Sequence, residues 1–445
     1  MIAWTPQQVA EAAGAELLAA DPSALPAGGP THAVIGSADV TPGALFAGLP
    51  GANVDGGRFS ADALTRGAWG ALARPEHLEA LVASGGVPAG AVLLATTDPL
   101  LALQRLATAW RRALGATVIG VTGSTGKTTT KELVAAMGRT VAPTHATAAN
   151  FNTEIGLPLT ILGAPADTKL LVLEMGMRGA GQIAELCEIA EPDVGIVVNV
   201  GPAHLELMGS IEAIAREKGS LLDHLPPGGT AIAPADEPLL AGHRREGVHW
   251  VTFGPAGDVP VEAVPPALGL AARPAHVQLD AAAALAAVRA AGIEPVGPLE
   301  ALPGAGRGAV HEGVAGSTVI DDCYNANPMS MRAALTELSQ REATRRVAVL
   351  GDMLELGDQS ALLHADLGDQ ATEAGVGLLV TVGPRAAAAA TTFSGGEVLG
   401  FDTASQAAEA LPSLVEDGDA VLVKGSRGVG LEVVVAALTN EREMA

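Results

Sequence analysis

The stretch TVIGVTGSTGKTTTKEL, residues 117–133, places a glycine-rich turn between an apolar strand and the start of a helix. Backbone N–H groups of such a turn, with the helix N-terminus, hold phosphate oxygens, while a lysine meets the β/γ-phosphates and a hydroxyl faces Mg²⁺. The strict pattern needs a glycine where Val121 stands, so this is a shorter G-x-x-G-K-T form. We predict a nucleotide site, in preference to a chance glycine-rich turn, formed by Gly123, Ser124, Thr125, Gly126, Lys127, Thr128 and Thr129.

Buried apolar segments alternate with helical segments after this turn. LLVLE (170–174) and VGIVVNV (194–200) predict strands, whereas QIAELCEIA (182–190) and residues 211–224 predict helices. Alternation of this kind indicates βαβ units and a parallel sheet with helices on both faces. The alanine-rich segment 280–291 predicts a further helix of the domain that contains the glycine-rich turn, a P-loop domain.

A second alternating series occupies the last third of the chain. RVAVLGD (346–352), GLLVTVG (377–383), VLGF (398–401) and AVLVKGS (420–426) each predict a strand, so we expect a smaller, Rossmann-like open sheet. The tract Ala386–Ala390 predicts an exposed helical turn.

The remaining segments set the expected domain boundaries. Short apolar runs at 44–49 and 91–95 lie between turn clusters and predict a small N-terminal α/β domain, and LPGAGRG at 302–308 is typical of a linker. The chain is therefore predicted to be an α/β protein of three domains, covering residues 1–98, 99–302 and 303–445.

Charge and hydropathy exclude several classes of partner. With 445 residues and a formal charge of -23, the chain is a poor candidate for binding DNA or RNA, because its field repels phosphate. The N-terminal segment lacks a basic region followed by a continuous apolar run, and no stretch is apolar for about 18 residues. We expect a cytoplasmic protein without membrane insertion, and a monomer by default. Cys187 and Cys323 are expected to be small buried hydrophobes.

The basic residues are unevenly distributed, because only five of the 26 are lysines. Lysine is a compact charge that can lose its proton when buried, so each lysine in an arginine-rich chain invites a functional interpretation. Lys127 lies in the predicted phosphate turn. Lys218 lies on the predicted helix 211–224, where a surface lysine is the simpler interpretation and a desolvated, reactive amine is the alternative.

Two candidate metal ligands follow predicted strands. Glu174 ends one strand and His204 lies four residues beyond another, and the carboxyl ends of parallel strands meet at the edge where ligands bind. Alone, each also fits an ordinary polar residue at the end of a strand. Beside the phosphate turn, a carboxylate and an imidazole favour metal ligation.

The segment IDDCYNANPMSMRAAL, residues 320–335, gathers polar side chains between a predicted strand and a helix that opens at Pro328. Such density indicates either elaborate helix capping or a ligand-facing loop, and the presence of the only tyrosine, Tyr324, favours the loop. Lys424 and Arg427, after the last predicted strand, suit a carboxylate or a phosphate.

Taken together, these segments resemble the Mur ligase family. The matching segments extend in order from residue 122 to residue 432: TGSTGKTTTKE, NFNTEIGLPLTIL, EMGMRGAGQI, NVGPAHLE, GSIEAIAREKGSLL, GRGAVHEG, DDCYNANPMSMRAAL, LGDMLELGDQS and VKGSRGVGLE. PGALFAGLPGANVDGGRFSADALTRGA resembles the family's nucleotide-sugar domain more weakly. EMGMRG, YNANP and KGSR are much more specific than the phosphate turn.

The resemblance implies an ATP-dependent ligase that forms an amide bond. It implies that residues 1–98 bind the UDP part of UDP-N-acetylmuramoyl-tripeptide, that residues 99–302 bind ATP, and that residues 303–445 bring the amine, D-alanyl-D-alanine. ATP would phosphorylate the acceptor carboxylate, and the amine would displace phosphate from the acyl phosphate. The resemblance further implies that this reaction belongs to peptidoglycan precursor synthesis and that ADP and phosphate are its other products.

The resemblance also assigns roles to residues. Lys127, Lys218 and His204 are implied to be catalytic, Thr128 and Glu174 to bind one Mg²⁺, and His204 with a carbamylated Lys218 to serve a second. Further nucleotide contacts are implied for Asn150, Arg307, Asp322, Tyr324 and Asn325. Substrate contacts are implied for Ser37, Lys424, Ser426 and Arg427.

The chain departs from the family pattern at three places, of which one is the connection 255–274, shorter than is usual, and the other two are changed signatures. Gly36-Ser37-Ala38 stands where an Asp-Ser-Arg signature is common, and His276-Val-Gln-Leu-Asp280 replaces a His-Asn-x-x-Asn pattern near the adenine. Two sister activities remain as alternatives: addition of the third residue to the muramoyl peptide, and addition of glutamate to folate. A non-catalytic P-loop switch is the alternative from another class, although it needs no second metal.

Overall fold

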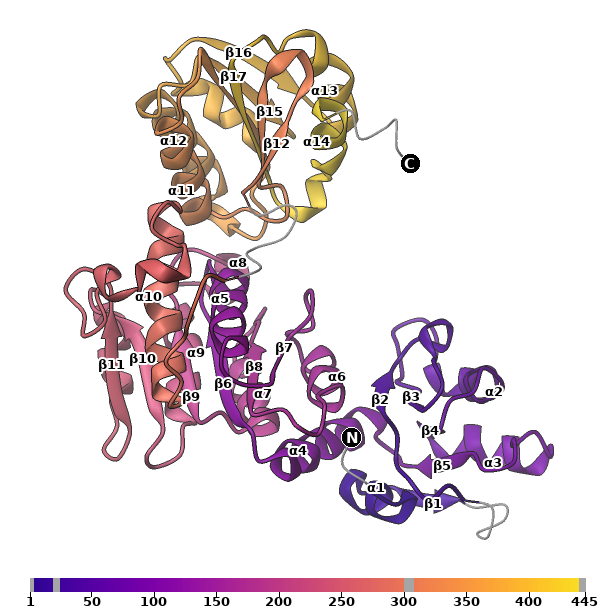
Figure 1. Cartoon of the computed structure of the whole chain (residues 1–445). Coiled ribbons are helices and arrows are strands. Elements are labelled where there is room, and N and C mark those ends of the chain that lie inside the picture. The colour runs from indigo at the N-terminus through magenta and orange to yellow at the C-terminus, as the bar shows by residue number, and fades with distance from the viewer. Residues whose placement is uncertain (1–3, 19–24, 300–307, 440–445) are drawn as a thin grey trace.

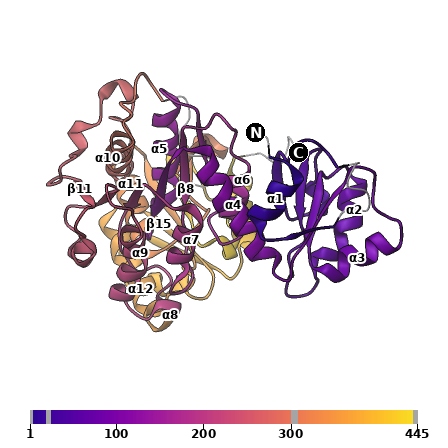
Figure 2. The same cartoon turned by 90° about the horizontal axis from the view of Figure 1, so that it is seen from below.

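The computed structural model describes residues 4–18, 25–299 and 308–439. It contains three α/β domains, each built on its own sheet (Figure 1). In Figure 1 the small N-terminal sheet lies to one side of the central sheet, and the C-terminal sheet lies above it. The view from below shows the N-terminal domain beside the central domain, with the C-terminal domain overlapping the central one (Figure 2). The predicted fold class is confirmed.

The N-terminal sheet has five strands in the order β1-β5-β4-β3-β2, with only the β1–β5 pair antiparallel. The three inner strands β3, β4 and β5 are short, apolar and fully buried, as expected for strands covered on both faces, whereas the edge strands β1 and β2 begin with Glu16 and His32 and are only partly buried. The strands are β1 (Glu16–Leu18), β2 (His32–Val34), β3 (Ala44–Ala47), β4 (Gly70–Ala73) and β5 (Val92–Ala95), and the helices are α1 (Pro6–Ala13), α2 (Ser60–Thr65) and α3 (Pro75–Ala83).

Helix α4 (Pro99–Leu114) joins this sheet to the central domain. Its buried face packs in one core cluster that contains Val9 and Leu45 from the N-terminal side and Leu171 from the central sheet. Trp110 of α4 also meets Trp4 edge to face, with ring centroids 5.1 Å apart. The two sheets therefore share apolar contacts through this helix.

The central sheet is entirely parallel, in the order β11-β10-β9-β6-β8-β7. The chain passes from β6 to one side of the sheet and later to the other, so the end of β6 is a topological switch point, where ligands bind in open sheets. The strands are β6 (Thr117–Thr122), β7 (Thr144–Ala146), β8 (Leu170–Glu174), β9 (Val194–Val197), β10 (Thr230–Pro234) and β11 (His249–Phe253).

Helices cover both faces of the central sheet, as predicted. Along β8, Leu171 and Leu173 pack with α7 and α9, whereas Leu170 and Val172 pack with α5 and α10. The predicted helix at 280–291 begins earlier, at Ala275, because Pro274 precedes its first turn. The helices are α5 (Lys127–Arg139), α6 (Gly156–Leu162), α7 (Gln182–Ala190), α8 (Leu205–Met208), α9 (Ile211–Asp223) and α10 (Ala275–Ala290).

The C-terminal sheet has the order β12-β13-β17-β14-β15-β16 and is parallel except for β12. Helices α13 and α14 cover one face, and α11 and α12 cover the other. The strands are β12 (Ala309–Glu312), β13 (Thr318–Asp321), β14 (Arg345–Gly351), β15 (Leu378–Val382), β16 (Glu397–Phe401) and β17 (Asp419–Lys424), and the helices are α11 (Pro328–Ser339), α12 (Ser360–Glu373), α13 (Ala404–Ala410) and α14 (Glu432–Leu438).

The alanine tract in this domain corrects one prediction. Residues Ala386–Thr391 form a 3₁₀ turn, but Ala386 and Ala389 are fully buried rather than exposed. Gly368 of α12 allows this close approach, since a Cβ there would lie 2.1 Å from the Ala389 carbonyl oxygen. The face of the tract that carries Ala386 and Ala389 therefore packs tightly against α12, whereas Ala387 and Ala390 are exposed.

Candidate active site

The glycine-rich turn follows β6 and opens α5, as its sequence predicts. Gly126 has a φ of 74°, a left-handed conformation that glycine adopts without steric cost, and it is the N-cap residue of α5. The Asn199 side chain accepts hydrogen bonds from the N–H groups of Ser124 (3.1 Å) and Thr125 (2.9 Å). The N–H groups left to contact a phosphate would therefore be mainly the later ones, at the start of the helix.

Two lysines converge on the first carbonyl of the turn. Lys127 Nζ donates to the Gly123 oxygen at 2.8 Å, and Lys218 Nζ donates to the same oxygen at 2.9 Å. The Lys218 side chain is 1% exposed, so its interpretation as a surface lysine is wrong. Burial, followed by the charge of Lys127, holds the pKa of Lys218 well below its ordinary value, so its amine is stabilised in the neutral form.

The neighbouring Glu217 fixes the helix that carries this lysine. Glu217 is 7% exposed and accepts hydrogen bonds from the N–H groups of Gly181 and Ile183, both at 2.8 Å, at the start of α7. A carboxylate at a helix N-terminus is favoured by the helix dipole. Helix α9 is thereby held against α7, and Lys218 faces the back of the glycine-rich turn.

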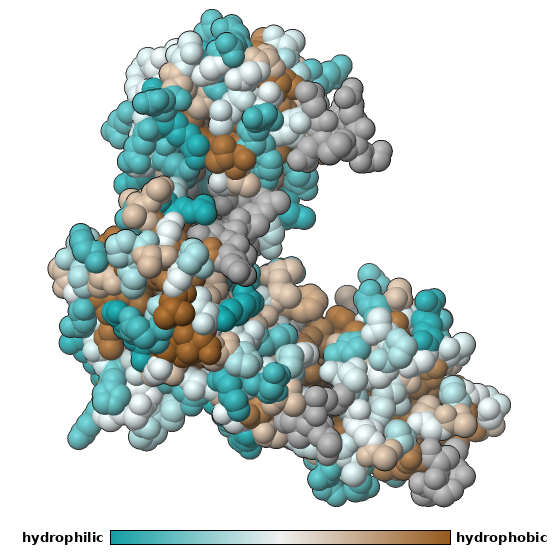
Figure 3. Space-filling model, viewed as in Figure 1, coloured by the Kyte–Doolittle hydropathy of each residue, from teal (hydrophilic) through white to brown (hydrophobic). Residues whose placement is uncertain are grey.

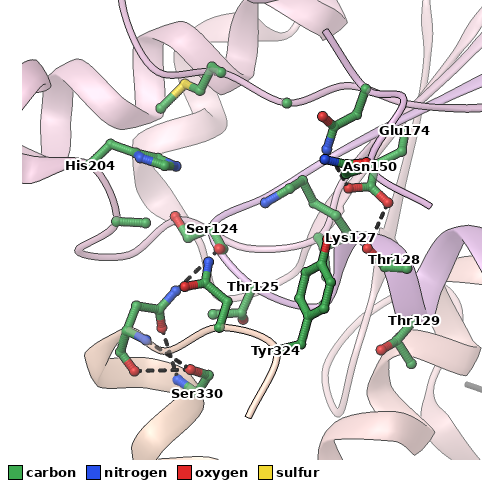
Figure 4. A pocket seen from close by; sticks show the side chains of 18 of the residues that line it. Ser124, Thr125, Lys127, Thr128, Thr129, Asn150, Glu174, His204, Tyr324 and Ser330 are labelled. Carbon is green, nitrogen blue, oxygen red and sulfur yellow. Dashed lines mark hydrogen bonds between the residues drawn. The ribbon is translucent and has the colours of Figure 1, made fainter. Parts of the chain in front are cut away.

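Thr128, Glu174 and Asn152 form a polar group beside the turn. Thr128 Oγ1 donates to Glu174 Oε2 at 2.7 Å (Figure 4), and Asn152 Nδ2 donates to Glu174 Oε1 at 2.8 Å. Glu174 is 3% exposed, so both of its oxygens are held in fixed positions. Hard oxygen donors in this arrangement fit Mg²⁺. Among the described residues no three His, Cys, Asp or Glu side chains form a metal cluster, so further ligands would come from phosphate and water.

A cavity of about 1180 Å³ surrounds this group and receives residues from all three domains. In the space-filling view the C-terminal lobe at the top and the N-terminal lobe at the lower right are apart, and the central lobe joins them (Figure 3). Most of the predicted site residues line the cavity, namely Ser124, Thr125, Gly126, Lys127, Thr128, Thr129, Asn150, Glu174, His204, Asp322, Tyr324, Asn325, Lys424, Ser426 and Arg427.

Three predicted residues lie outside the cavity wall. Gly123 begins the turn and Lys218 lies behind it, and neither is part of the cavity wall. Ser37 is also outside the wall, although Ile35 lines the cavity. The Ser37 hydroxyl instead forms a hydrogen bond that lowers the pKa of the Asp62 carboxyl. Arg307 lies outside the described residues.

The C-terminal domain presents a buried ion pair to the cavity. Lys424 is 2% exposed, and its Nζ donates to Asp322 Oδ2 at 2.6 Å and to the Asn325 carbonyl at 3.0 Å. Burial raises the pKa of Asp322, although Lys424 opposes that rise. The Arg427 guanidinium lies 5.4 Å from the centroid of the Tyr324 ring, and Figure 4 shows Tyr324 and Lys127 directed into the same space.

Two side-chain contacts connect the C-terminal domain to the central one here. Asn327 Nδ2 donates to the Ser124 carbonyl at 3.3 Å, and His204 Nδ1 lies 2.5 Å from Glu355 Oε2. Burial lowers the pKa of His204, and the Glu355 carboxylate opposes that shift. The C-terminal domain is thus in contact with the glycine-rich turn itself.

Buried groups at the rear of the cavity include an unexpected acid. Asp280 of α10 is 6% exposed and burial raises its pKa well above the ordinary value, which favours a neutral carboxyl. It lies close to the turn, since a Cβ on Gly126 would be 2.9 Å from both Asp280 oxygens. Asp280, which replaces asparagine in the family pattern, is therefore favoured as a neutral carboxyl group, and this group has nearly the same shape as the asparagine side chain.

Three functional side chains were not singled out as site residues from the sequence: Asn152, Asn199 and Glu355. Asn199 is the second-last residue of the predicted strand 194–200, so its position near a carboxyl end is a usable signal. Asn152 and Glu355 lie in loops, and nothing in their local sequence indicates which side chains they meet.

The fold and the cavity together define an enzyme-like P-loop protein in which three α/β domains surround one nucleotide site. Family models match in the same order along the chain: the Mur ligase family catalytic domain at residues 31–111, the Mur ligase middle domain at 121–263 and the Mur ligase glutamate ligase domain at 306–427. The chain belongs to the Mur ligase family.

Within this family, the chain is similar to several individual proteins. The chain is 37% identical to a UDP-N-acetylmuramoyl-tripeptide--D-alanyl-D-alanine ligase of Synechocystis sp., covering 90% of each chain. A crystal structure of MurF from Acinetobacter baumannii matches with a TM-score of 0.82 and 29% identity, covering 98% of this chain and 99% of that one. MurF ligase from Thermotoga maritima in complex with ADP matches with a TM-score of 0.79 and 29% identity, covering 93% and 98%.

Proposed function

We propose that this protein is an ATP-dependent ligase that adds D-alanyl-D-alanine to UDP-N-acetylmuramoyl-tripeptide in peptidoglycan precursor synthesis. One observation carries the proposal: the phosphate turn with Thr128 and Glu174, the C-terminal Lys424 and Arg427, and Ile35 of the N-terminal domain all line one cavity. The Synechocystis relative acts, by its name, on this acceptor and this dipeptide.

The reaction needs activation because a carboxylate is too stable for direct attack by an amine. The acceptor carboxylate oxygen attacks the γ-phosphorus of ATP, and ADP departs, leaving an acyl phosphate. The amine of D-alanyl-D-alanine then attacks the acyl carbon, a proton is lost from its nitrogen, and phosphate leaves with the former carboxylate oxygen. The products are the amide, ADP and phosphate.

The residues of the cavity serve this reaction chiefly by position and charge. Lys127 would neutralise the transferred phosphoryl group, and the helix N-terminus behind it would hold the β-phosphate. Lys424 and Arg427 would bind anionic groups of the substrates, and Tyr324 offers a flat face to the nucleotide base. Asn150, Asp322 and Asn325 lie near enough in the same wall to add polar contacts to ATP.

Mg²⁺ fits the hydroxyl and carboxylate oxygens of Thr128 and Glu174. When bound there it would neutralise phosphate charge during phosphoryl transfer. His204 is the candidate ligand for a second ion. Lys218 supplies the chemistry for a carbamate, since a neutral amine can add to CO₂, and the carbamate would bring a negative charge to the back of the turn.

The setting of the reaction follows from its substrates. Both the nucleotide-linked acceptor and ATP are cytoplasmic, so we place the protein there and expect it to act as a monomer. No helix among the described residues has the length and apolarity required to span a bilayer. The domain limits 1–98, 99–302 and 303–445 are likewise proposed as the units that bind acceptor, ATP and amine.

Phosphate release tests the proposal directly. The purified chain is incubated with ATP, Mg²⁺ and a UDP-muramoyl-tripeptide, and D-alanyl-D-alanine or single amino acids are added in turn. Release with the dipeptide, matched by a muramoyl-pentapeptide product, is expected. Release only with a single amino acid, or only with a folate and glutamate, would instead identify a sister ligase. Absence of release with every acceptor would favour a nucleotide switch.

A further inference from the structure

A histidine of the central domain and a glutamate of the C-terminal domain meet at the edge of the cavity. His204 lies between β9 and α8, and Glu355 lies in the loop after β14. His204 Nδ1 is 2.5 Å from Glu355 Oε2, and the Glu206 N–H donates to the Glu355 carbonyl at 3.2 Å. Side chain and backbone of one loop are therefore both bound to the other loop.

The backbone at this contact is unusual on both sides. His204 has a φ of 60° and Glu355 a φ of 63°, a left-handed conformation that residues with side chains rarely adopt. Gly357, two residues after Glu355, packs so closely that a Cβ there would lie 3.3 Å from Glu206 Cα. Both loops thus hold strained residues where they meet, which is typical of a functional contact rather than a casual surface one.

The contact dictates where the imidazole hydrogen lies. An ionised carboxylate accepts hydrogen bonds but cannot donate, so Nδ1 of His204 carries the hydrogen that Glu355 accepts. In the neutral ring this leaves the lone pair on Nε2. His204 and Glu355 line the same cavity as Lys127 and Thr128, so a lone pair fixed on Nε2 is available to a ligand there.

We propose that Glu355 is a positioning residue, which fixes the tautomer and the orientation of His204 for its role in phosphoryl transfer. Carboxylates that accept a hydrogen bond from a ligating imidazole commonly act in this way. Because Glu355 belongs to the domain assigned to the incoming amine, His204 is correctly set only when that domain is docked. The inference rests on the proposed function and deepens it.

The first test reads the tautomer without nucleotide or metal. The full chain is labelled with ¹⁵N-histidine, and the His204 signals are identified by their loss in His204→Gln. We expect wild-type His204 with a protonated Nδ1 and an unprotonated Nε2. Glu355→Ala should shift this population towards the Nε2–H form, whereas Asp358→Ala, which removes an exposed acid of the same loop, should not. Unchanged His204 signals in Glu355→Ala would overturn the proposal.

The second test separates positioning from folding. Glu355→Ala is expected to lower kcat for dipeptide-dependent phosphate release about 10- to 100-fold, with little change in the KM for ATP. Glu355→Gln, whose amide oxygen can still accept from Nδ1, should recover part of that loss, and Asp358→Ala should match wild type. Equal kcat values for Glu355→Ala and Asp358→Ala would overturn the proposal. If the wild-type chain releases no phosphate, that result contradicts the proposed function and not the role of Glu355. The comparison of His204 tautomers in wild type and Glu355→Ala would still decide whether Glu355 orients His204.

Discussion

Replacing Lys218 by methionine separates the chemical use of this buried amine from its part in folding. The side chain is 1% exposed and forms one hydrogen bond, to a Gly123 oxygen that also accepts from Lys127 at 2.8 Å. Loss of one hydrogen bond whose acceptor keeps another donor costs about 1 kcal/mol. Methionine has a similar length and removes the need to bury an amine. We therefore expect Lys218→Met to be at least as stable as wild type at pH 7.

The pH dependence of stability tests the same assignment. The pKa of Lys218 is lowered in the folded chain, so the unfolded chain binds more protons at pH values between the folded-state pKa and the ordinary value of 10.5. Stability of the wild type therefore rises with pH across that window. Lys218→Met lacks this contribution, so its stability advantage should shrink as the pH rises towards 10.5.

Activity should respond in the opposite way to stability. Methionine, alanine and arginine side chains cannot form a carbamate. Lys218→Met, Lys218→Ala and Lys218→Arg should therefore each lower dipeptide-dependent phosphate release by about 10²- to 10³-fold, the usual loss when a group that stabilises a transition state is removed. Lys169→Met, which removes an exposed lysine, is the control and should be unaffected. Full activity of Lys218→Arg would refute the carbamate, and full activity of Lys218→Met would refute any chemical role.

Three further changes test the phosphate turn and its surroundings. Gly126→Ala should abolish ADP binding by calorimetry, because its left-handed φ and its proximity to Asp280 leave no room for a Cβ, whereas Gly115→Ala, with a φ of 60° and nothing within 4 Å, should bind normally. Thr128→Val removes the hydroxyl bonded to Glu174, so a magnesium titration of phosphate release should show a higher half-saturating concentration and about 10- to 100-fold lower turnover. Asp280→Asn should raise the thermal midpoint at pH 7.5 and lose this advantage near pH 4. The reason is that the pKa of Asp280 is raised in the folded chain, so wild-type stability falls as the pH rises above the ordinary value of 3.8. An equal advantage at both pH values would contradict a neutral carboxyl.

The strands and helices around the phosphate turn were predictable because parallel strands buried on both faces are continuous apolar runs. LLVLE and QIAELCEIA correspond residue for residue to β8 and α7. The predicted helix at 211–224 ends one residue earlier, at Asp223. Here local composition and tertiary environment agree, so periodicity alone is informative.

Burial of single polar residues was not predictable in the same way. Lys218 lies on an amphipathic helix beside the polar residues Arg216 and Glu217, and only the packing of α9 against α7 shows that it faces inward. The sequence also predicts an exposed turn for Ala386 and Ala389, because an alanine tract is compatible with either exposure or tight packing. Gly368 on another helix decides between the two.

The contacts between domains lie furthest from sequence reasoning. His204 and Glu355 are 151 residues apart, and their hydrogen bond depends on how two loops from different sheets are docked. Strand ends indicated that His204 lies at a ligand-binding edge, but no local pattern specifies its partner. The same holds for Asn327, which reaches the Ser124 carbonyl 203 residues away.

Transfer of ¹⁸O tests the central claim most directly. The acceptor tripeptide is labelled with ¹⁸O in its reacting carboxylate and incubated with the protein, ATP, Mg²⁺ and D-alanyl-D-alanine, and the released phosphate is analysed by mass spectrometry. An acyl phosphate requires one ¹⁸O to appear in phosphate for each amide bond formed, and only with the dipeptide present as the amine. Unlabelled phosphate, or labelled phosphate formed equally with single amino acids, would contradict the assignment.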